Sequence, residues 1–493
     1  MSKHRNNKKV ASKISTIAKE LKQVSEMSNH QMQVEIGGTG HYSIQQLEQM
    51  GKAGELAGMN LTGYNLDGIN LAGDNLQGTN FQGDSMKGAD LKGANLAYGE
   101  LQNTNLDGAN LENAQLALQG SETPTGANFT SASMEQVNLQ SAYADTAIFA
   151  KADMQNAQMS NIQAVDTKFY QADMANADIS GANMWTANFN GANLESANLT
   201  GASLQTATMN GTNLDSANLT ETGLDYALMT NVTFAGAILH QTNMQGTEFT
   251  GVNLSGRNLS GDQVNLEGAQ FLSNDNLNHA NLSGLNIAGA LFENGTTLID
   301  ANLSGAQAGY FETNTLFNNA NLQGANLQGA NLSSATLDSS NFSGANMNGI
   351  NLHDAVGYQS NFSGAQMVDA NLTHSGLDSF NFSYANMEGA NLTNAVSLDS
   401  NFDYATLTDA NLTSLNARVD HHLAAQDTFV GVSAEHANFE NADLSESSFQ
   451  NADVQYANFV NADTRAIDWQ GANARDAIFN NPLAPMTEEA VKV

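Results

Sequence analysis

From Leu56 onward, an apolar residue returns at every fifth position of the chain. The series begins with Leu56, Leu61, Leu66, Leu71, Leu76, Phe81, Met86, Leu91 and Leu96. A small residue usually lies two positions before each member, and Asn or Asp lies between them, as in Ala192-Asn193-Leu194. A period of five fits neither a strand, which repeats every 2 residues, nor a helix, which repeats every 3.6. The chain must therefore turn once in each quintet, so that every central residue faces the same interior.

Glycine at the second position after the centre supports such a turn. It occupies positions 58, 63, 68, 73, 78, 83, 88 and 93 without interruption. Because glycine has no Cβ, it adopts the positive φ angles of tight turns without steric cost. We therefore expect a corner of the chain at each of these positions.

A second period, of twenty residues, predicts the number of sides. Phe recurs at positions 129, 149, 169 and 189, at 342, 362, 382 and 402, and at 439, 459 and 479. Residues twenty apart should stack directly, so four quintets should close one coil with a square cross-section. Residues 56–479 then make about 21 coils and, at about 4.8 Å per coil, a rod roughly 100 Å long.

Quintets such as Ala94-Asn95-Leu96, Ala182-Asn183-Met184 and Ala442-Asp443-Leu444 resemble those of the pentapeptide-repeat family. The resemblance covers residues 56–479. It implies an all-β fold, a right-handed quadrilateral β-helix, which agrees with the square coil. The expected fold is thus a β-solenoid of pentapeptide repeats with a short N-terminal α-helix.

The pattern divides the chain into four parts. Residues 1–36 are predicted to form a basic amphipathic helix and linker, residues 37–55 an N-terminal cap, residues 56–479 the solenoid, and residues 480–493 a tail. Within the cap, Ser43 followed three residues later by Gln46 predicts a short capped helix at 43–50. The repeat slips near 117–126, 260–265, 309–317 and 417–428, where we expect loops.

Charge separates the head of the chain from its body. Residues 1–22 hold seven basic side chains and one acid, whereas the rest of the chain holds ten bases and 49 acids. The apolar residues Val10, Ile14, Ile17, Leu21 and Val24 follow the spacing of one helix face. This helix could self-associate, contact an anionic surface such as a membrane, serve as a docking or export signal, or fold back over the first coil.

Two loops supply candidate interaction residues, because loops on a rigid scaffold often carry recognition. These residues are Glu122 and Pro124 in the first loop, and Asp420, His421 and His422 in the last. The histidines with Asp420 and Asp427 match no metal-site spacing. We therefore predict no catalytic, cofactor or metal site, and no enzyme.

Three further expectations concern side-chain direction. Asp74 and Asp84 occupy the inward small position, and we expect the early coils to splay outward and leave both carboxylates in water; the alternative is a buried polar site. Tyr384 and Tyr404 should stack on the outside. The column Gly357, Leu377 and Ser397 should pack loosely.

The favoured function is that of a non-enzymatic, rod-like binding or scaffold protein that engages a protein partner. The resemblance implies an alternative, a DNA mimic acting on a type II topoisomerase such as gyrase. The acidic body would carry one charge per roughly 2.6 Å, against about 1.7 Å for duplex DNA. A third class is a secreted bacterial effector. Direct nucleic-acid binding is not expected, because the body would repel phosphate.

The chain contains no Cys and no long apolar run, and both absences limit its possible covalent chemistry and its cellular location. No disulfide can form, and no segment reaches the roughly 20 apolar residues of a membrane span. We expect a cytoplasmic protein, or one exported without a cleavable secretory signal.

Overall fold

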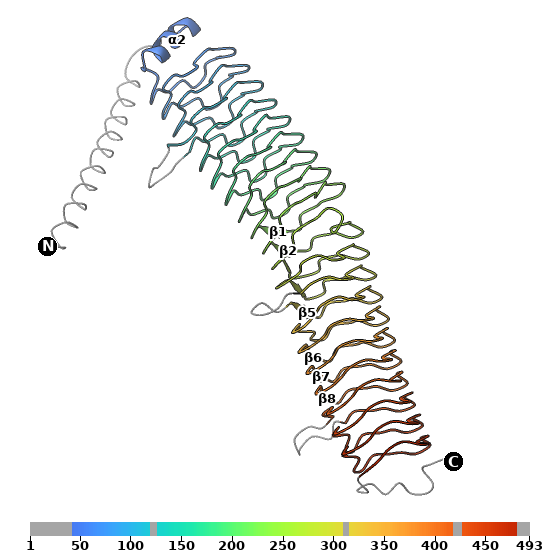
Figure 1. The fold of residues 1–493 in the computed structure, drawn as a ribbon. Coiled ribbons are helices and arrows are strands. Elements are labelled where there is room, and N and C mark those ends of the chain that lie inside the picture. The colour runs from blue at the N-terminus through green and yellow to red at the C-terminus, as the bar shows by residue number, and fades with distance from the viewer. Residues whose placement is uncertain (1–41, 119–125, 309–314, 418–425, 481–493) are drawn as a thin grey trace, which may run out of the picture. The chain divides into compact units, whose positions relative to one another are not determined.

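The structure is a computed structural model that describes residues 42–118, 126–308, 315–417 and 426–480. The chain divides into two compact units. The first comprises Met1–Thr208 and Thr212–Asn218, and the second comprises Met209–Gly211 and Leu219–Val493. Each unit is a stack of similar coils (Figure 1).

Helix α2 (Ile44–Lys52) opens the described part of the first unit and confirms the helix predicted at 43–50. Ser43 is its N-cap. The Ser43 hydroxyl accepts the N–H of Gln46, and the Gln46 side chain accepts the N–H of Ser43. This reciprocal capping box satisfies backbone donors that the first helical turn leaves free.

One face of α2 packs on the repeat. Leu47 and Gly51 are the buried residues of the helix. A Cβ on Gly51 would lie 2.1 Å from Oδ2 of Asp74 and 3.1 Å from Cδ2 of Leu71. The absent side chain therefore lets the helix backbone approach the coil that contains these two residues.

In both units, backbone pairing joins residues twenty apart. Parallel bridges join Asn60 to Asn80 in the first unit and Asn341 to Asn361 in the second. In the core, the rings of Phe342 and Phe362 stack with their centroids 4.7 Å apart. This separation is close to the ~4.8 Å between neighbouring strands. Four quintets therefore close one coil, as the sequence predicts.

The pairing interval lengthens where the sequence pattern slips. The longer intervals join Glu100 to Asn128, Asn253 to Asn276, Thr297 to Asn321, and Asn401 to Thr428. Intervals of twenty resume after the first, third and fourth of these, for example from Asn128 to Ile148, whereas the second is followed by intervals of 21, as from Asn276 to Thr297. Each insertion is thus accommodated at a corner without ending the stack.

Short parallel strands lie on one side of the second unit (Figure 1). They are β1 (Leu228–Thr230), β2 (Glu248–Thr250), β3 (Gln270–Phe271), β4 (Leu291–Glu293), β5 (Leu316–Asn318), β6 (Val356–Tyr358), β7 (Gly376–Asp378) and β8 (Val396–Leu398). The first five form one sheet and the last three another. Bridges from Leu316 to Thr336 and from Thr336 to Val356 join the two sheets. We call this side the strand face.

The turns follow the predicted glycine positions. The eight glycines from Gly58 to Gly93 have φ between 60° and 90°. Further along, other residues take the same left-handed conformation, including Asn103 (φ 60°) and Tyr384 (φ 59°). Asn tolerates this region well, whereas a bulky residue there is unusual.

The prediction of loose packing in the column Gly357, Leu377 and Ser397 is wrong at Gly357. Phe380 occupies an inward position that usually holds a small residue, and its side chain is buried. Its ring stacks on Phe362, with centroids 5.4 Å apart. A Cβ on Gly357 would lie 2.8 Å from Cζ of Phe380. The Phe380 ring therefore fills the space that Gly357 leaves open.

The expectation that Asp74 and Asp84 point into water is also wrong. Both residues are buried, with relative exposures of 8% and 2%. The early coils do not splay, so the inward position stays inward. Asp84 Oδ1 accepts the N–H groups of Gly63 (2.6 Å) and Tyr64 (3.2 Å) in the preceding coil. Asp74 lies beneath Gly51 of helix α2. The alternative, a buried polar site, is correct.

Other inward polar residues also bond to the neighbouring coil. The hydroxyl of Thr79 donates to the carbonyl of Leu56, and that of Thr104 donates to the carbonyl of Phe81, each at 2.8 Å. In both pairs the acceptor precedes the donor by 23 residues. A buried hydroxyl needs such a partner, because an unpaired one would be destabilising.

Candidate interaction surfaces

All ten candidate interaction residues of the sequence lie outside the described residues. They are Val10, Ile14, Ile17, Leu21, Val24, Glu122, Pro124, Asp420, His421 and His422. Their roles stay predictions. The described residues on either side of the two loops still show where each loop leaves the coils.

Asp427 falls within the loop expected at 417–428, but it lies in the described part of the chain and its side chain points into the core. Its side chain is fully buried, and Oδ1 accepts the N–H of Ser400 at 2.8 Å. It is therefore not available to a ligand on the surface. Among the described residues, no group of three or more His, Cys, Asp or Glu side chains is placed to hold a metal ion.

Three buried aspartates share an environment that disfavours the charged form. Burial raises the pKa of Asp84 to about 7 and that of Asp275 to about 6, although both carboxylates accept backbone N–H bonds. Burial also raises the pKa of Asp427 well above its usual range. Shifted carboxyl groups often mark catalytic sites. Here they lie inside the coils, out of reach of a substrate.

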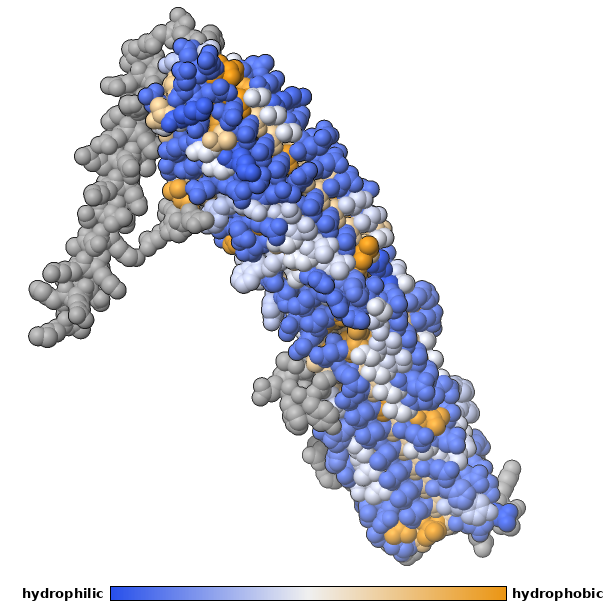
Figure 2. Space-filling view, turned by 45° about the horizontal axis from the view of Figure 1, so that its top comes forward, coloured by the Kyte–Doolittle hydropathy of each residue, from blue (hydrophilic) through white to orange (hydrophobic). Residues whose placement is uncertain are grey.

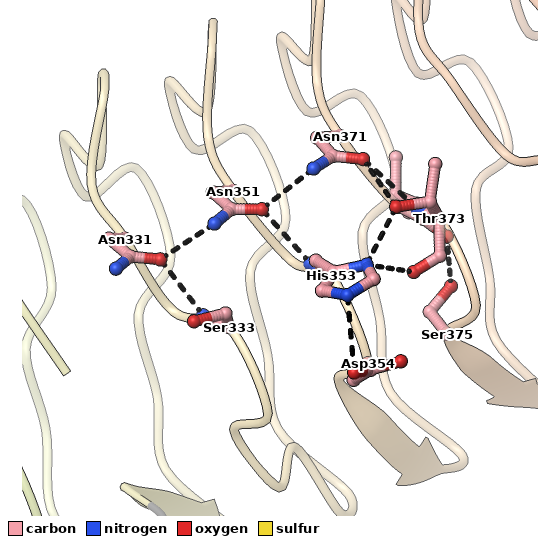
Figure 3. A network of polar contacts seen from close by, with 9 residues as sticks. Asn331, Ser333, Asn351, His353, Asp354, Asn371, Thr373 and Ser375 are labelled. Carbon is pink, nitrogen blue, oxygen red and sulfur yellow. Dashed lines mark hydrogen bonds and ion pairs between the residues drawn. The ribbon is translucent and has the colours of Figure 1, made fainter. Parts of the chain in front are cut away.

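On the outside of the coils, asparagine side chains form ladders (Figure 3). Nδ2 of Asn351 donates to Oδ1 of Asn331 at 2.8 Å, and Nδ2 of Asn371 donates to Oδ1 of Asn351 at 2.9 Å. The Oδ1 of Asn351 also accepts the N–H of His353 at 3.2 Å. The Asn351 amide is thus held by the coil before it, by the coil after it and by its own turn.

The residues beside this ladder are ordered as well (Figure 3). Nδ1 of His353 lies 2.8 Å from Oγ1 of Thr373, and Nε2 lies 3.2 Å from Oδ2 of Asp354. The hydroxyl of Thr373 also donates to Oδ1 of Asn371 at 2.8 Å. The side chains beside this ladder therefore form a fixed polar array, with hydrogen bonds both within a coil and between coils.

Tyr384 and Tyr404 form a stacked pair on the outside, as the sequence predicts. Their ring centroids lie 5.1 Å apart with an interplanar angle of 10°. The side chains are 65% and 53% exposed. The Tyr404 ring continues over Gly431, where a Cβ would be 2.7 Å from the ring. We call this pair the tyrosine ridge.

Apolar side chains also project from the strand face. Val356 and Tyr358 in β6 are each 47% exposed, and Val396 in β8 is 39% exposed. Gly376 in β7 lies between the two valines. Most of the surface in Figure 2 is hydrophilic, with hydrophobic residues in small separate patches. An exposed apolar cluster on such a surface is a candidate contact site.

Charge is distributed unevenly within the second unit. Between Arg257 and Arg418 the sequence contains fourteen Asp or Glu residues and no Lys or Arg. A stretch of sequence with acids and no Lys or Arg favours cationic partners. Within the described ranges, no helix has the length and apolar character needed to cross a bilayer.

The four-quintet coils define the class of this protein: it is a β-solenoid with a five-residue repeat. The family model for pentapeptide repeats matches more than half of the chain. The matched residues are 85–117, 127–163, 147–185, 187–225, 227–261, 313–354, 337–373, 381–414 and 429–463. The chain therefore belongs to the pentapeptide-repeat family, and its fold is the right-handed quadrilateral β-helix that the sequence predicts.

Solved structures of other pentapeptide-repeat proteins are similar to this chain. HetL, involved in heterocyst differentiation regulation in the cyanobacterium Nostoc sp. strain PCC 7120, is 21% identical; the match covers 62% of this chain and 97% of HetL, with a TM-score of 0.16. QnrB1, a plasmid-mediated fluoroquinolone resistance protein, is 18% identical over 48% of this chain and 92% of its own, with a TM-score of 0.20.

A third similar structure is Rfr23 from the cyanobacterium Cyanothece 51142. It is 26% identical over 27% of this chain and 90% of its own, with a TM-score of 0.11. No curated protein sequence matches the chain. The family assignment rests on the repeat itself.

Proposed function

We propose that this chain is a non-enzymatic binding protein that presents fixed side-chain arrays to a protein partner. The observation that carries the proposal is that outward polar side chains are held in place by hydrogen bonds between coils, as in the Asn331–Asn351–Asn371 ladder. Side chains held in one geometry lose little conformational entropy on binding. The buried position of the shifted carboxylates argues against acid–base catalysis by them.

The tyrosine ridge is the best candidate anchor for that partner. Aromatic residues contribute much of the binding energy at protein interfaces. The ridge is also held in place. Oδ1 of Asp403, the residue before Tyr404, accepts the N–H of Val430 at 2.8 Å. Both rings are therefore presented on ordered backbone rather than on a mobile loop.

The experiment is a crosslinking pull-down with the full-length chain and with a Tyr384→Asn/Tyr404→Asn variant. Asn suits the left-handed backbone of both positions (φ 59°). The partner should be recovered with the wild type and lost with the double variant. The matched control is Tyr226→Asn, because Tyr226 is also exposed and left-handed and also covers a glycine of the next coil.

Equal recovery of the partner with the double variant would remove the ridge from the proposal. A chain that lacks residues 1–30 adds a second comparison, because the basic head is the other candidate docking element. Loss of the partner with that chain alone would place the contact in the head. Recovery of no specific partner with any of these chains would contradict the binding function itself.

A second candidate function is mimicry of DNA toward a type II topoisomerase. The cation-free stretch between Arg257 and Arg418 favours it. Its fourteen acids occupy about eight coils, or roughly one acidic residue per 2.7 Å at the usual strand spacing, and one of them, Asp275, is buried. However, the acids are distributed over all sides of the coil rather than along a line. Salt-sensitive inhibition of gyrase supercoiling is the expected result, and no effect at stoichiometric protein would exclude this function.

A further inference from the structure

The apolar cluster on the strand face contains a notch one side chain wide. Val356, Gly376 and Val396 pair in register across β6, β7 and β8. The two valines are therefore about 10 Å apart, which is two strand spacings. A Cβ on Gly376 would meet Cγ1 of Val356 at 3.5 Å, which is ordinary van der Waals contact. The notch can thus receive an apolar side chain from outside.

Carboxylates lie on the same side of the coils. Asp338 Oδ1 accepts the N–H of Tyr358 at 2.9 Å, which fixes this acid beside the cluster. Asp378 ends β7, and Asp399 directly follows β8. Between Arg257 and Arg418 the sequence contains no Lys or Arg. The surface therefore fits a partner that is both apolar and cationic.

The chain itself contains a segment with these properties. The predicted head helix carries the apolar seam of Val10, Ile14, Ile17, Leu21 and Val24. Lys8, Lys9, Lys13, Lys19 and Lys22 lie among these apolar residues. We propose that residues 8–24 of one copy dock on the Val356–Gly376–Val396 notch of a second copy, with the lysines facing the carboxylates.

Such docking predicts a closed dimer. If each copy inserts its head into the notch of the other, the two contacts are equivalent and the assembly stops at two chains. The interaction combines apolar burial with attraction between opposite charges, so raising the salt concentration should weaken it. This inference does not depend on the partner proposed for the tyrosine ridge.

The absence of Cys from the chain allows a direct test. Two differently tagged full-length variants, Ile17→Cys and Gly376→Cys, are mixed and oxidised under mild conditions. The expected main product is the mixed disulfide dimer, identified by its two tags. Gln366→Cys replaces Gly376→Cys in the control, because Gln366 is exposed in the same coil and also lies one residue before a buried centre, Met367. Equal crosslinking of Gln366→Cys and Gly376→Cys would overturn the proposal.

Sedimentation of Cys-free full-length chains gives an independent measurement. The wild type should dimerise, and Gly376→Glu should weaken dimerisation at least about tenfold, or about 1.4 kcal/mol, because its side chain fills the notch. Gln366→Glu adds the same charge elsewhere and should leave the dimer intact. A wild type that stays monomeric, or a dimer that survives both Gly376→Glu and Lys9→Glu/Lys13→Glu, contradicts the proposal. Binding of the head only to anionic lipid vesicles contradicts it too.

Discussion

The carboxylate of Asp427 accepts the backbone N–H of Ser400 in the coil before it, at 2.8 Å. Asp275 bonds to the N–H of Val252 in the same way, also at 2.8 Å. At an ordinary inward position, by contrast, the N–H bonds within its own turn, as Ala385 does to the carbonyl of Phe382. An inward aspartate therefore supplies an acceptor to the preceding coil at these sites. As a consequence, a carboxyl group lies in the core, where its charged form is disfavoured.

This arrangement predicts that stability falls as the pH rises toward neutrality. The pKa of Asp84 is about 7 in the folded chain, against about 3.9 in an unfolded one. Between these values the folded state binds more protons, so the free energy of unfolding decreases from about pH 4 to pH 7 and then levels off. Thermal unfolding at pH 5, 6, 7 and 8 measures this slope.

The variant Asp84→Asn should reduce that slope and raise stability at pH 8, because the amide keeps an acceptor oxygen and carries no charge. Glu195→Gln is the control in the same unit, since Glu195 is exposed. It should keep the wild-type slope. An Asp84→Asn chain with an unchanged pH profile would show that this carboxyl does not titrate in the folded state near neutrality.

The repeat made the solenoid predictable, because a twenty-residue period fixes which side chains stack. The burial of Asp84 was missed for an energetic reason. The register predicts an inward side chain, whereas the cost of desolvating a carboxylate favours an outward one. The polar groups that compensate it, the N–H groups of Gly63 and Tyr64, belong to another coil and cannot be paired with it from a single quintet.

Phe380 was missed because its partner is also remote in sequence. Its ring meets Gly357, 23 residues earlier. The same interval joins Thr79 to Leu56 and Thr104 to Phe81. An inward residue thus contacts the central residue of a quintet in the preceding coil, 23 positions earlier. In such repeats this interval predicts which residues are partners. The stacking of Tyr384 on Tyr404 was predictable, because both residues lie two positions after a centre.

The pairing of Phe380 with Gly357 predicts compensation. Phe380→Ser alone should destabilise the second unit by about 3–5 kcal/mol, because it leaves a void. Gly357→Leu alone should also destabilise it, because the added side chain overlaps the Phe380 ring. The double variant has a small residue at inward position 380 and an apolar residue at central position 357, which is the usual pattern of the repeat. Chemical denaturation of all four chains should therefore give a double variant more stable than the sum of the single effects predicts.

The left-handed turn positions should tolerate Asn but not a β-branched residue. Gly344 has φ 67°, and a Cβ there would meet nothing within 4 Å. Any loss of stability in Gly344→Val is therefore conformational, and we expect about 1–3 kcal/mol. Gly344→Asn should lose much less. Gly376→Val serves as the control, because a Cβ there makes only ordinary contacts and the backbone is not left-handed. A loss in Gly376→Val as large as that in Gly344→Val would contradict this reason.

The contact between helix α2 and the repeat should depend on the missing side chain of Gly51. Gly51→Ala places a methyl group 2.1 Å from Oδ2 of Asp74, so the helix must shift and its amides should exchange faster with solvent. Asp74→Ala should relieve much of this effect in the double variant, although Cδ2 of Leu71 at 3.1 Å still restricts the methyl. Ser43→Ala is a useful comparison, because loss of the N-cap costs about 1 kcal/mol without any clash. Hydrogen exchange of residues 44–52 distinguishes the two causes, since Asp74→Ala should rescue Gly51→Ala and should not rescue Ser43→Ala.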